Sequence, residues 1–313
     1  MFFAKLGKNR GQFAKIVQIC TKIHFMEAKQ LKWAYLLVLS LVWGSSFILI
    51  KRGLVGLSAV QVGAFRIIFA ALLLLIFGFK SLLKISAGQW KFVAMTSFFG
   101  TFVPAFLFAI AETEVDSSIV AIMNSLTPLN TLVLGAILFG IQFQKRQVWG
   151  VFIGLIGCLL LVLSGAVAHP GQNYYYVGLV VIATICYAVN VNLIKRYLPD
   201  LNSVSITTGN FAVLLIPALI ILGSTDISQK LSLEETQHSI FFVMILGVVG
   251  TGIANILFFK LIQISSPVFA TSVTYLIPIV AFFWGLLDNE MLTPIQFFGA
   301  FIILIGVYLS AKK

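Results

Sequence analysis

The sequence contains very little charge. Only 10% of its 313 residues are Asp, Glu, Lys or Arg, whereas about a quarter are charged in a typical soluble domain. Hydrophobic residues make up 60% of the chain, and the mean hydropathy is +1.04. Water does not solvate such a composition well. A soluble globular protein is therefore excluded, and an all-α polytopic membrane protein is predicted.

Motifs for metals, disulfides and nucleotides are also missing. The three cysteines, Cys20, Cys158 and Cys186, form no CxxC pair, and the three histidines lie far apart, so neither a disulfide framework nor a metal centre is expected. No GxxxxGK[ST] phosphate loop is present, which argues against an ATP-driven pump. We therefore expect no cofactor. Nor do we expect a nucleic-acid partner, because the basic residues lie in short segments between apolar runs.

Long apolar runs dominate the chain instead. A helix needs about 20 apolar residues to cross the ~30 Å of hydrocarbon in a bilayer. The connectors between the runs are short, so no room remains for a soluble catalytic domain and no enzymatic activity is expected. We expect ten spans, at roughly 33–50, 59–79, 91–111, 117–140, 147–168, 175–194, 204–223, 239–259, 267–287 and 294–311.

The distribution of Lys and Arg predicts the orientation of these spans. With a cytoplasmic N-terminus, seventeen of the 21 basic residues fall on the cytoplasmic side, and only Lys51, Arg52 and Lys230 fall outside. Arg66 lies within a span. This asymmetry predicts a multi-pass protein of the cell membrane, inner or plasma, with both termini cytoplasmic. The expected outer loops carry most of the acidic residues: Glu112, Glu114, Asp116, Asp226, Glu234, Glu235, Asp288 and Glu290.

The tail, residues 1–32, allows two interpretations. It lacks the 7–15-residue apolar core of a secretory signal peptide. Phe13, Ile16 and Cys20 fall on one face of a helix that would lie on the inner leaflet, with lysines elsewhere. The alternative is that translation begins at Met26, which would give an ordinary short cytoplasmic start.

The chain repeats itself at a nearly constant spacing. The tetrapeptide LIKR occurs at 49–52 and again at 193–196, each time at the end of an apolar run. The offset between matching positions stays between 144 and 150 through five spans, and such self-similarity indicates a duplicated unit. The matched pairs include Gly100 with Gly250, Thr101 with Thr251, Phe108 with Phe258, Pro128 with Pro278 and Gly135 with Gly285.

Each unit, at 33–168 and 175–311, holds five spans. Because five is odd, the second unit begins on the opposite side of the membrane and the two repeats are inverted. Inverted repeats are a known transporter design, in which the halves exchange conformations around a site near the midplane. The sequence therefore indicates alternating-access transport.

Several stretches resemble a known family. LLVLSLVWGSSFILIK (36–51) resembles the first span of EamA-type members of the drug/metabolite transporter superfamily. Phe65-Arg66 followed by AALLLL, SSIVAIMNSLTP (117–128) and DNEMLTPIQFFGAFIILIGVYL (288–309) resemble the second, fourth and last spans. The resemblance covers about 33–311. It implies ten helices around a central cavity, and usually export of small metabolites or amino acids across a cytoplasmic membrane.

The second repeat departs from this pattern. It has Tyr187-Ala188 where the first has Trp43-Gly44, and no arginine matches Arg66. Such asymmetry is expected of two copies that diverged around one asymmetric substrate, and also of simple drift.

Ionisable groups within a membrane are costly and are candidates for function. Arg66 is about seven residues into its span, so it either contacts substrate or a protein partner, or extends to the headgroups. Lys260 closes the eighth span and is either an interface anchor or a ligand. Lys51 sits at the expected outer mouth, where it either remains from the duplication or holds an anionic solute or lipid.

Polar and aromatic residues within spans supply the other candidates, although many such residues only join helices. Asn124, Asn190 and Asn255 are preferred for the cavity because they lie near mid-span. Ser46 is the repeat partner of Asn190, and Tyr275 lies in the ninth span. The remaining cavity candidates are the repeat partners Trp43 and Tyr187, which either form an aromatic wall or simply pack.

Proline and glycine within the spans affect helix geometry. Pro128 and Pro278 occupy equivalent positions, where each is either a gating hinge or a static bend. Gly150, Gly154 and Gly157 have the spacing of a close helix contact, either within the chain or in a homodimer.

No Asp or Glu lies near the middle of a span. A lipophilic cation is therefore a poor substrate, and a zwitterion or another carboxylate-bearing solute that meets Arg66 is favoured. The sequence indicates a secondary transporter, an exporter of small organic metabolites such as amino acids. The alternatives are a channel or facilitator, and a membrane enzyme for lipid-linked substrates. The acidic cluster at 112–116 is expected to be a solvated loop rather than a metal site.

Overall fold

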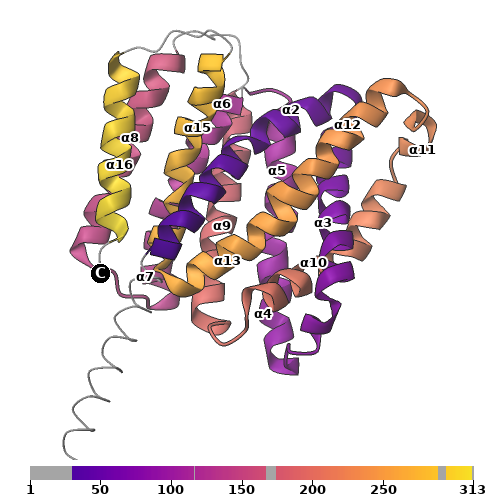
Figure 1. Cartoon of the computed structure of the whole chain (residues 1–313), viewed down its shortest axis with the longest axis horizontal. Helices are drawn as coiled ribbons and strands as arrows, with labels where there is room; N and C mark the ends of the chain where they lie inside the picture. The colour runs from indigo at the N-terminus through magenta and orange to yellow at the C-terminus, as the bar shows by residue number, and fades with distance from the viewer. Residues whose placement is uncertain (1–29, 116, 167–173, 288–293, 312–313) are drawn as a thin grey trace, which may run out of the picture.

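The computed structural model describes residues 30–115, 117–166, 174–287 and 294–311, and all regular structure in these ranges is helical (Figure 1). The tail through residue 29 lies outside the described residues, so both interpretations of it stay predictions. Asp116, Asp288 and Glu290 also lie outside the described residues.

Within the described ranges, six helices are long and apolar enough to cross a membrane. The first, Gln30–Gly56, is divided by a turn at Ser45, and its second part is α2 (Ser46–Gly56). The other five are α3 (Ala59–Leu82); Ala87–Ala111, made of α4 (Ala87–Ser97), η1 (Phe98–Phe102) and α5 (Val103–Ala111); α9 (Val177–Tyr197); α10 (Ser203–Gly223); and Glu234–Ile264, made of α12 (Glu234–Ile245), η4 (Leu246–Ile253) and α13 (Ala254–Ile264).

The other elements are shorter or less apolar. Shorter apolar helical stretches cover Asn124–Phe139, Pro267–Val280 and Phe301–Ser310. The elements that make up this part are α6 (Ser117–Met123), η2 (Asn124–Leu126), α7 (Thr127–Phe139), α8 (Lys145–Ala166), η3 (Tyr174–Tyr176), α11 (Ile227–Lys230), α14 (Pro267–Thr271), α15 (Val273–Leu287) and α16 (Pro294–Ala311).

Large apolar side chains cover the outside of the bundle. Phe77 is 82% exposed, Leu83 is 83% exposed and Ile137 is 73% exposed. Hydrocarbon suits such a surface because the side chains are apolar, and each helix also satisfies its own backbone hydrogen bonds there. The described chain is therefore a multi-pass membrane protein whose outer face suits lipid.

The bundle has two ends, named here by residues that lie at them. At the Glu112 end, α2 and α5 finish and α3 and α12 begin. At the Lys260 end, α13 finishes and α4 and α10 begin. Figure 1 shows α8 and α16 side by side at one edge of the bundle, and α3 packs along α10 at the other edge.

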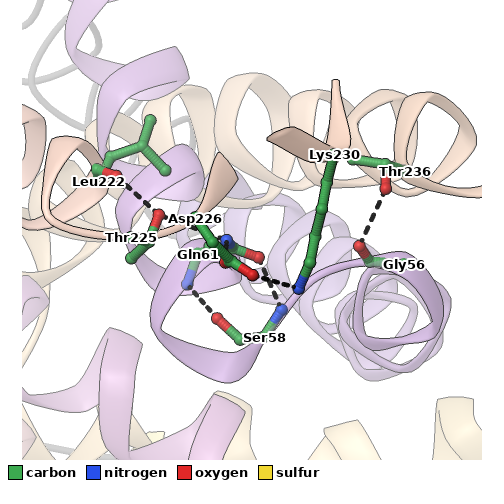
Figure 2. Close-up of polar contacts among 8 residues, drawn as sticks. All are labelled: Gly56, Ser58, Gln61, Leu222, Thr225, Asp226, Lys230 and Thr236. Carbon is green, nitrogen blue, oxygen red and sulfur yellow. Dashed lines mark hydrogen bonds and ion pairs between the residues drawn. The ribbon is translucent and has the colours of Figure 1, made fainter. Parts of the chain in front are cut away.

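A hydrogen-bond network ties the start of α3 to the connection between α10 and α12 at the Glu112 end (Figure 2). The buried Gln61 accepts from the Ser58 amide through Oε1 and donates through Nε2 to Thr225 Oγ1 and Asp226 Oδ1. The Lys230 ammonium lies 2.8 Å from Asp226, and its hydrogen bond lowers the pKa of that carboxyl group. Residues 164 or more positions apart in the chain are thereby joined.

The second LIKR lysine lies near the Lys260 end. Lys195 Nζ donates to the carbonyl oxygens of Ile262, Gln263 and Ser265, at 3.1, 3.3 and 2.7 Å. These groups end α13 and would otherwise lack intrahelical partners. A cation is favourable there because of the helix dipole. Lys51, the matching residue of the first LIKR, is exposed in α2.

Glycines allow α8 and α16 to pack backbone against backbone. A Cβ added to Gly306 would lie 2.5 Å from the Gly154 nitrogen and 2.7 Å from the Gly150 oxygen. A Cβ at Gly157 would lie 2.8 Å from the Gly299 oxygen. The close helix contact expected from the glycine spacing is confirmed, and its partner is α16 of the same chain.

Gly306→Ala should destabilise the protein, because its new methyl group meets backbone atoms that cannot rotate away. Overpacking of this kind costs about 1–3 kcal/mol. The thermal midpoint in detergent should fall by several degrees. The matched control is Gly178→Ala in α9, where no atom lies within 4 Å of the new Cβ. Equal midpoints for the two variants would contradict the close contact.

Candidate functional site

A cavity lies at the centre of the bundle. It holds about 830 Å³ of empty space, counting the part open to solvent. Helical segments from both halves of the chain line it, from residue 43 in the first described helix to residue 277 in α15. Neither half of the sequence could form this cavity alone.

Irregular backbone surrounds the cavity. η1 and η4 are π-helical segments within long helices, and η2 is a short 3₁₀ turn between α6 and α7. Each contributes lining residues: Thr101 from η1, Thr251 from η4 and Asn124 from η2. π-helical insertions are frequent at functional sites, where they turn side chains and free carbonyl groups. One carbonyl of η4, that of Gly250, accepts a hydrogen bond from Trp43 Nε1 at 2.9 Å.

The internal offset of the sequence recurs in contacts at the cavity. Gly100 of η1 packs on the Asn190 side chain, which a Cβ at residue 100 would strike. Gly250 of η4 packs on Ser46, where an added Cβ would lie 2.9 Å from Oγ. Asn190 follows Ser46 by 144 positions, and Gly250 follows Gly100 by 150. Each of the two matched glycines thus makes room for a polar side chain from the other half of the chain, and these two polar residues are themselves a matched pair.

Two aromatic contacts are related in the same way. Trp43 meets Phe258 edge to face, with ring centroids 4.9 Å apart. Tyr187 stacks on Phe108, with centroids 5.9 Å apart. Phe258 follows Phe108 by 150 positions, and all four rings line the cavity. Trp43 and Tyr187 thus both line the cavity and pack on other rings, so the choice between their two predicted roles stays open.

Arg66 is the one charged side chain among the described residues that line the cavity. Its Nε donates to Thr251 Oγ1 at 2.6 Å, and this hydroxyl donates in turn to the Leu246 carbonyl at 3.0 Å. Among the described residues, no hydrogen bond or ion pair is formed by its two terminal nitrogens. The guanidinium is thus held along one side while its other donors remain available.

Polar groups without partners also face the cavity region. Asn190 Oδ1 and Thr101 Oγ1 are buried and have no hydrogen-bond partner within the described part of the chain. Both residues line the cavity. Buried polar atoms are usually paired, so an unpaired group at a cavity suggests a ligand or water. Oδ1 of Asn190 is an acceptor, suited to an N–H or O–H donor.

The structure places seven of the eight predicted cavity residues at the cavity. They are Trp43, Ser46, Arg66, Asn124, Tyr187, Asn190 and Asn255. Tyr275 differs, because it is fully buried away from the lining and its hydroxyl donates to the Val151 carbonyl at 2.9 Å. A sequence pattern places a residue at a depth within a span. It does not show whether the side chain points toward the cavity or toward a neighbouring helix such as α8.

The four predicted mouth and gating residues lie apart from one another. Pro128, in the first turn of α7, and Pro278, within α15, are buried. Lys51 in α2 and Lys260 in α13 are exposed. None of the four lines the cavity, and their roles in gating stay predictions.

Other polar residues in the spans join helices, as most were expected to. Asn130 Nδ2 donates to Thr184 Oγ1 at 2.9 Å, and Asn192 Nδ2 donates to the Thr131 carbonyl at 3.0 Å. These bonds hold α7 against α9. Sequence reasoning missed Thr101 and Thr251 as lining residues, although their matched Gly-Thr pairs in the two repeats were a usable signal.

Comparisons with known proteins agree with this arrangement. A sequence model of the EamA-like transporter family matches residues 31–163 and again residues 175–312. An uncharacterized inner membrane transporter of Escherichia coli, YedA, is 27% identical over 89% of this chain and 92% of its own length.

Two further relatives and one solved structure are similar to this chain over most of its length. An uncharacterized transporter of Archaeoglobus fulgidus is 24% identical over 90% of this chain and 99% of its own. A probable amino-acid metabolite efflux pump of E. coli is 24% identical over 88% of this chain and 92% of its own. One crystal structure aligns with this chain with a TM-score of 0.68 at 15% sequence identity. The alignment covers 91% of this chain and 97% of the other chain, which shows a shared fold.

Tyr275→Phe should lower stability and leave transport intact, because the hydroxyl bonds to α8 and does not reach the cavity. Loss of one buried hydrogen bond costs about 0.5–1.5 kcal/mol, and more if the carbonyl is left unpaired. The thermal midpoint and the uptake rate in proteoliposomes are measured on the same preparation. A loss of transport with an unchanged midpoint would return Tyr275 to the site.

Proposed function

Because the chain belongs to the EamA-like transporter family, we propose that it is a secondary transporter that carries small carboxylate-bearing metabolites, amino acids among them, through the central cavity. The observation that carries the proposal is Arg66, the single charge among the described lining residues, with its terminal nitrogens unbonded.

The geometry of Arg66 suits a carboxylate. With Nε held by Thr251, the two terminal nitrogens remain for a bidentate contact with two carboxylate oxygens. Such charge-assisted hydrogen bonds are about twice as strong as neutral ones. The described lining offers no carboxylate that would compete from within the cavity.

The rest of the lining suits an amino acid with an apolar side chain. Asn190 Oδ1 is a free acceptor for an ammonium group. The rings of Trp43, Phe108, Tyr187 and Phe258 offer an apolar wall. The name of the E. coli relative described as an amino-acid metabolite efflux pump supports both this substrate class and export.

Alternating access between two inverted five-helix repeats is the mechanism that we propose. The remaining four of the ten expected spans coincide with α6–α7, α8, α14–α15 and α16. The family model matches twice, once in each proposed repeat, and the matched contacts at the cavity join one repeat to the other. In such a protein the two halves exchange conformations, so that the cavity opens to each side in turn.

Arg66→Ala should lower the initial rate of leucine transport in proteoliposomes by about tenfold or more, because hydrogen bonds to charged groups are worth about 1.5–3 kcal/mol. Transport of 3-methylbutylamine, which is leucine without its carboxylate, should be no better in the wild type than in Arg66→Ala.

Two variants serve as controls for Arg66→Ala. Thr251→Val keeps the cation but removes its partner, and should retain more activity than Arg66→Ala. Lys84→Ala removes an exposed cation that is not a candidate for the site and should behave as the wild type. Unchanged leucine transport by a folded Arg66→Ala protein would remove Arg66 from the site.

The inverted topology predicts opposite accessibility for the two LIKR arginines, which are both exposed. In a cysteine-free background, Arg52→Cys should react with a membrane-impermeant maleimide from outside intact cells. Arg196→Cys should react only after the cells are permeabilised. Labelling of both from the same side would refute the inversion.

A further inference from the structure

Glu112 lies in the turn after α5, as expected of a loop residue, but its side chain is only partly exposed rather than fully solvated. It directly follows α5, outside the membrane-spanning helix Ala87–Ala111. Its Oε2 accepts a hydrogen bond from Ser117 Oγ at 2.8 Å. Its Oε1 is buried and has no partner among the described residues. The surrounding structure therefore satisfies only half of this carboxylate.

Two cations act on Glu112 from neighbouring helices, Arg66 from α3 and Lys51 from α2. Neither comes close enough for an ion pair within the described structure. The titratable groups that act on Glu112 are therefore Lys51 and Arg66. Two phenols, Tyr176 of η3 and Tyr187 of α9, pack against the apolar cluster that includes Phe108 and Ala111 of α5.

Burial dominates the titration of Glu112. It raises the pKa of the carboxyl group to about 8, although the Ser117 hydrogen bond and the charges of Arg66 and Lys51 all act to lower it. Near pH 8 the group is thus poised between its two states, and below that pH the protonated acid dominates. A change of charge beside it shifts this balance.

We propose that Glu112 is the proton-binding group of this transporter: ionised, it is the counter-charge of Arg66 in the empty cavity, and it takes up a proton when a carboxylate binds to Arg66. The inference rests on the proposed function, because it needs a carboxylate at Arg66.

The coupling follows from electrostatics. A substrate carboxylate neutralises Arg66 and places a second negative charge near Glu112, and both changes favour the protonated acid. Because linkage is reciprocal, a proton on Glu112 strengthens carboxylate binding by the same factor. At a pH where the empty protein has an ionised Glu112, the substrate and one proton then enter together, and the cavity region keeps the net charge that it had when empty.

The pKa of Glu112 is lower in the empty protein than in the protein with a bound carboxylate, and this order fixes the sign of the pH dependence. Well below pH 8, Glu112 is protonated with or without substrate, and affinity for a carboxylate is highest. As pH rises through about 8, the empty protein loses its proton first, and affinity falls until the occupied protein has lost its proton too. Each unit by which the carboxylate raises the pKa of Glu112 is a tenfold change in affinity.

The test is equilibrium binding of 4-methylpentanoate to the purified full chain from pH 6 to pH 10. This probe has the side chain and carboxylate of leucine without its ammonium group, so it does not itself titrate in this range. Wild-type affinity should fall several-fold as pH rises from 7 to 10. Calorimetry in two buffers of different ionisation enthalpy should show proton uptake between pH 8 and 9, approaching one proton per carboxylate.

Glu112→Gln should bind as the protonated wild type does, with high affinity that is independent of pH and without proton uptake. Glu114→Gln is the matched control, since it removes an exposed acid two residues away and should keep the wild-type profile. Ser117→Ala removes the hydrogen bond that favours the ionised acid, so its midpoint should move to higher pH. This variant tests the proposal even if Glu112→Gln does not fold.

The outcomes separate this inference from the proposed function. If neither leucine nor 4-methylpentanoate binds at any pH, the proposed function and this inference are both wrong. If 4-methylpentanoate binds through Arg66 but Glu112→Gln keeps the wild-type pH profile and proton uptake, the inference alone is wrong. It is equally wrong if Glu114→Gln loses the profile, or if the midpoint of Ser117→Ala does not move.

Discussion

Hydrocarbon offers no hydrogen bonds to a polypeptide, and the architecture follows from this constraint. All regular structure in the described ranges is helical, so that each segment satisfies its own backbone. Several departures from α-helix, namely η1, η2, η4 and the turn at Ser45, contribute lining residues of the central cavity or adjoin them. There, side chains such as Trp43 supply the hydrogen bonds that a regular helix would have made. Irregular backbone is tolerated in a membrane where it lines such a space.

The two halves contribute to the cavity by the same devices but with different chemistry. Gly100 and Gly250 admit Asn190 and Ser46, and the ring pairs of Trp43 and Tyr187 stand in matched positions. Arg66 has no counterpart in the other half. One half therefore supplies the charge, while the other supplies the Thr251 hydroxyl that holds it. A cavity that is similar in framework but polarised in charge suits a ligand with one acidic end.

Much of this could be read from composition and pattern, because hydrophobic length reports span location and a constant offset reports duplication. Asn124, Asn190 and Asn255 do line the cavity, but so do Thr127 and Thr274, so depth within a span narrows the candidates without selecting among them. Rotation about the helix axis was harder to infer. Tyr275 is at the right depth but faces α8. Charge predicted a solvated loop at 112–116, and Glu112 does follow α5 in a turn, but Ser117 bonds one of its carboxylate oxygens and the other is buried.

The sequence by itself determined the membrane class, the two similar units and the identity of the one charge at the cavity, because these depend on the order of apolar and polar residues along the chain. Only the tertiary structure decided which groups meet. The bond between Arg66 and Thr251 spans 185 positions, and the charges that act on Glu112 come from Arg66 in α3 and Lys51 in α2. Burial and charge act through space, and a linear pattern does not contain the distances on which they depend.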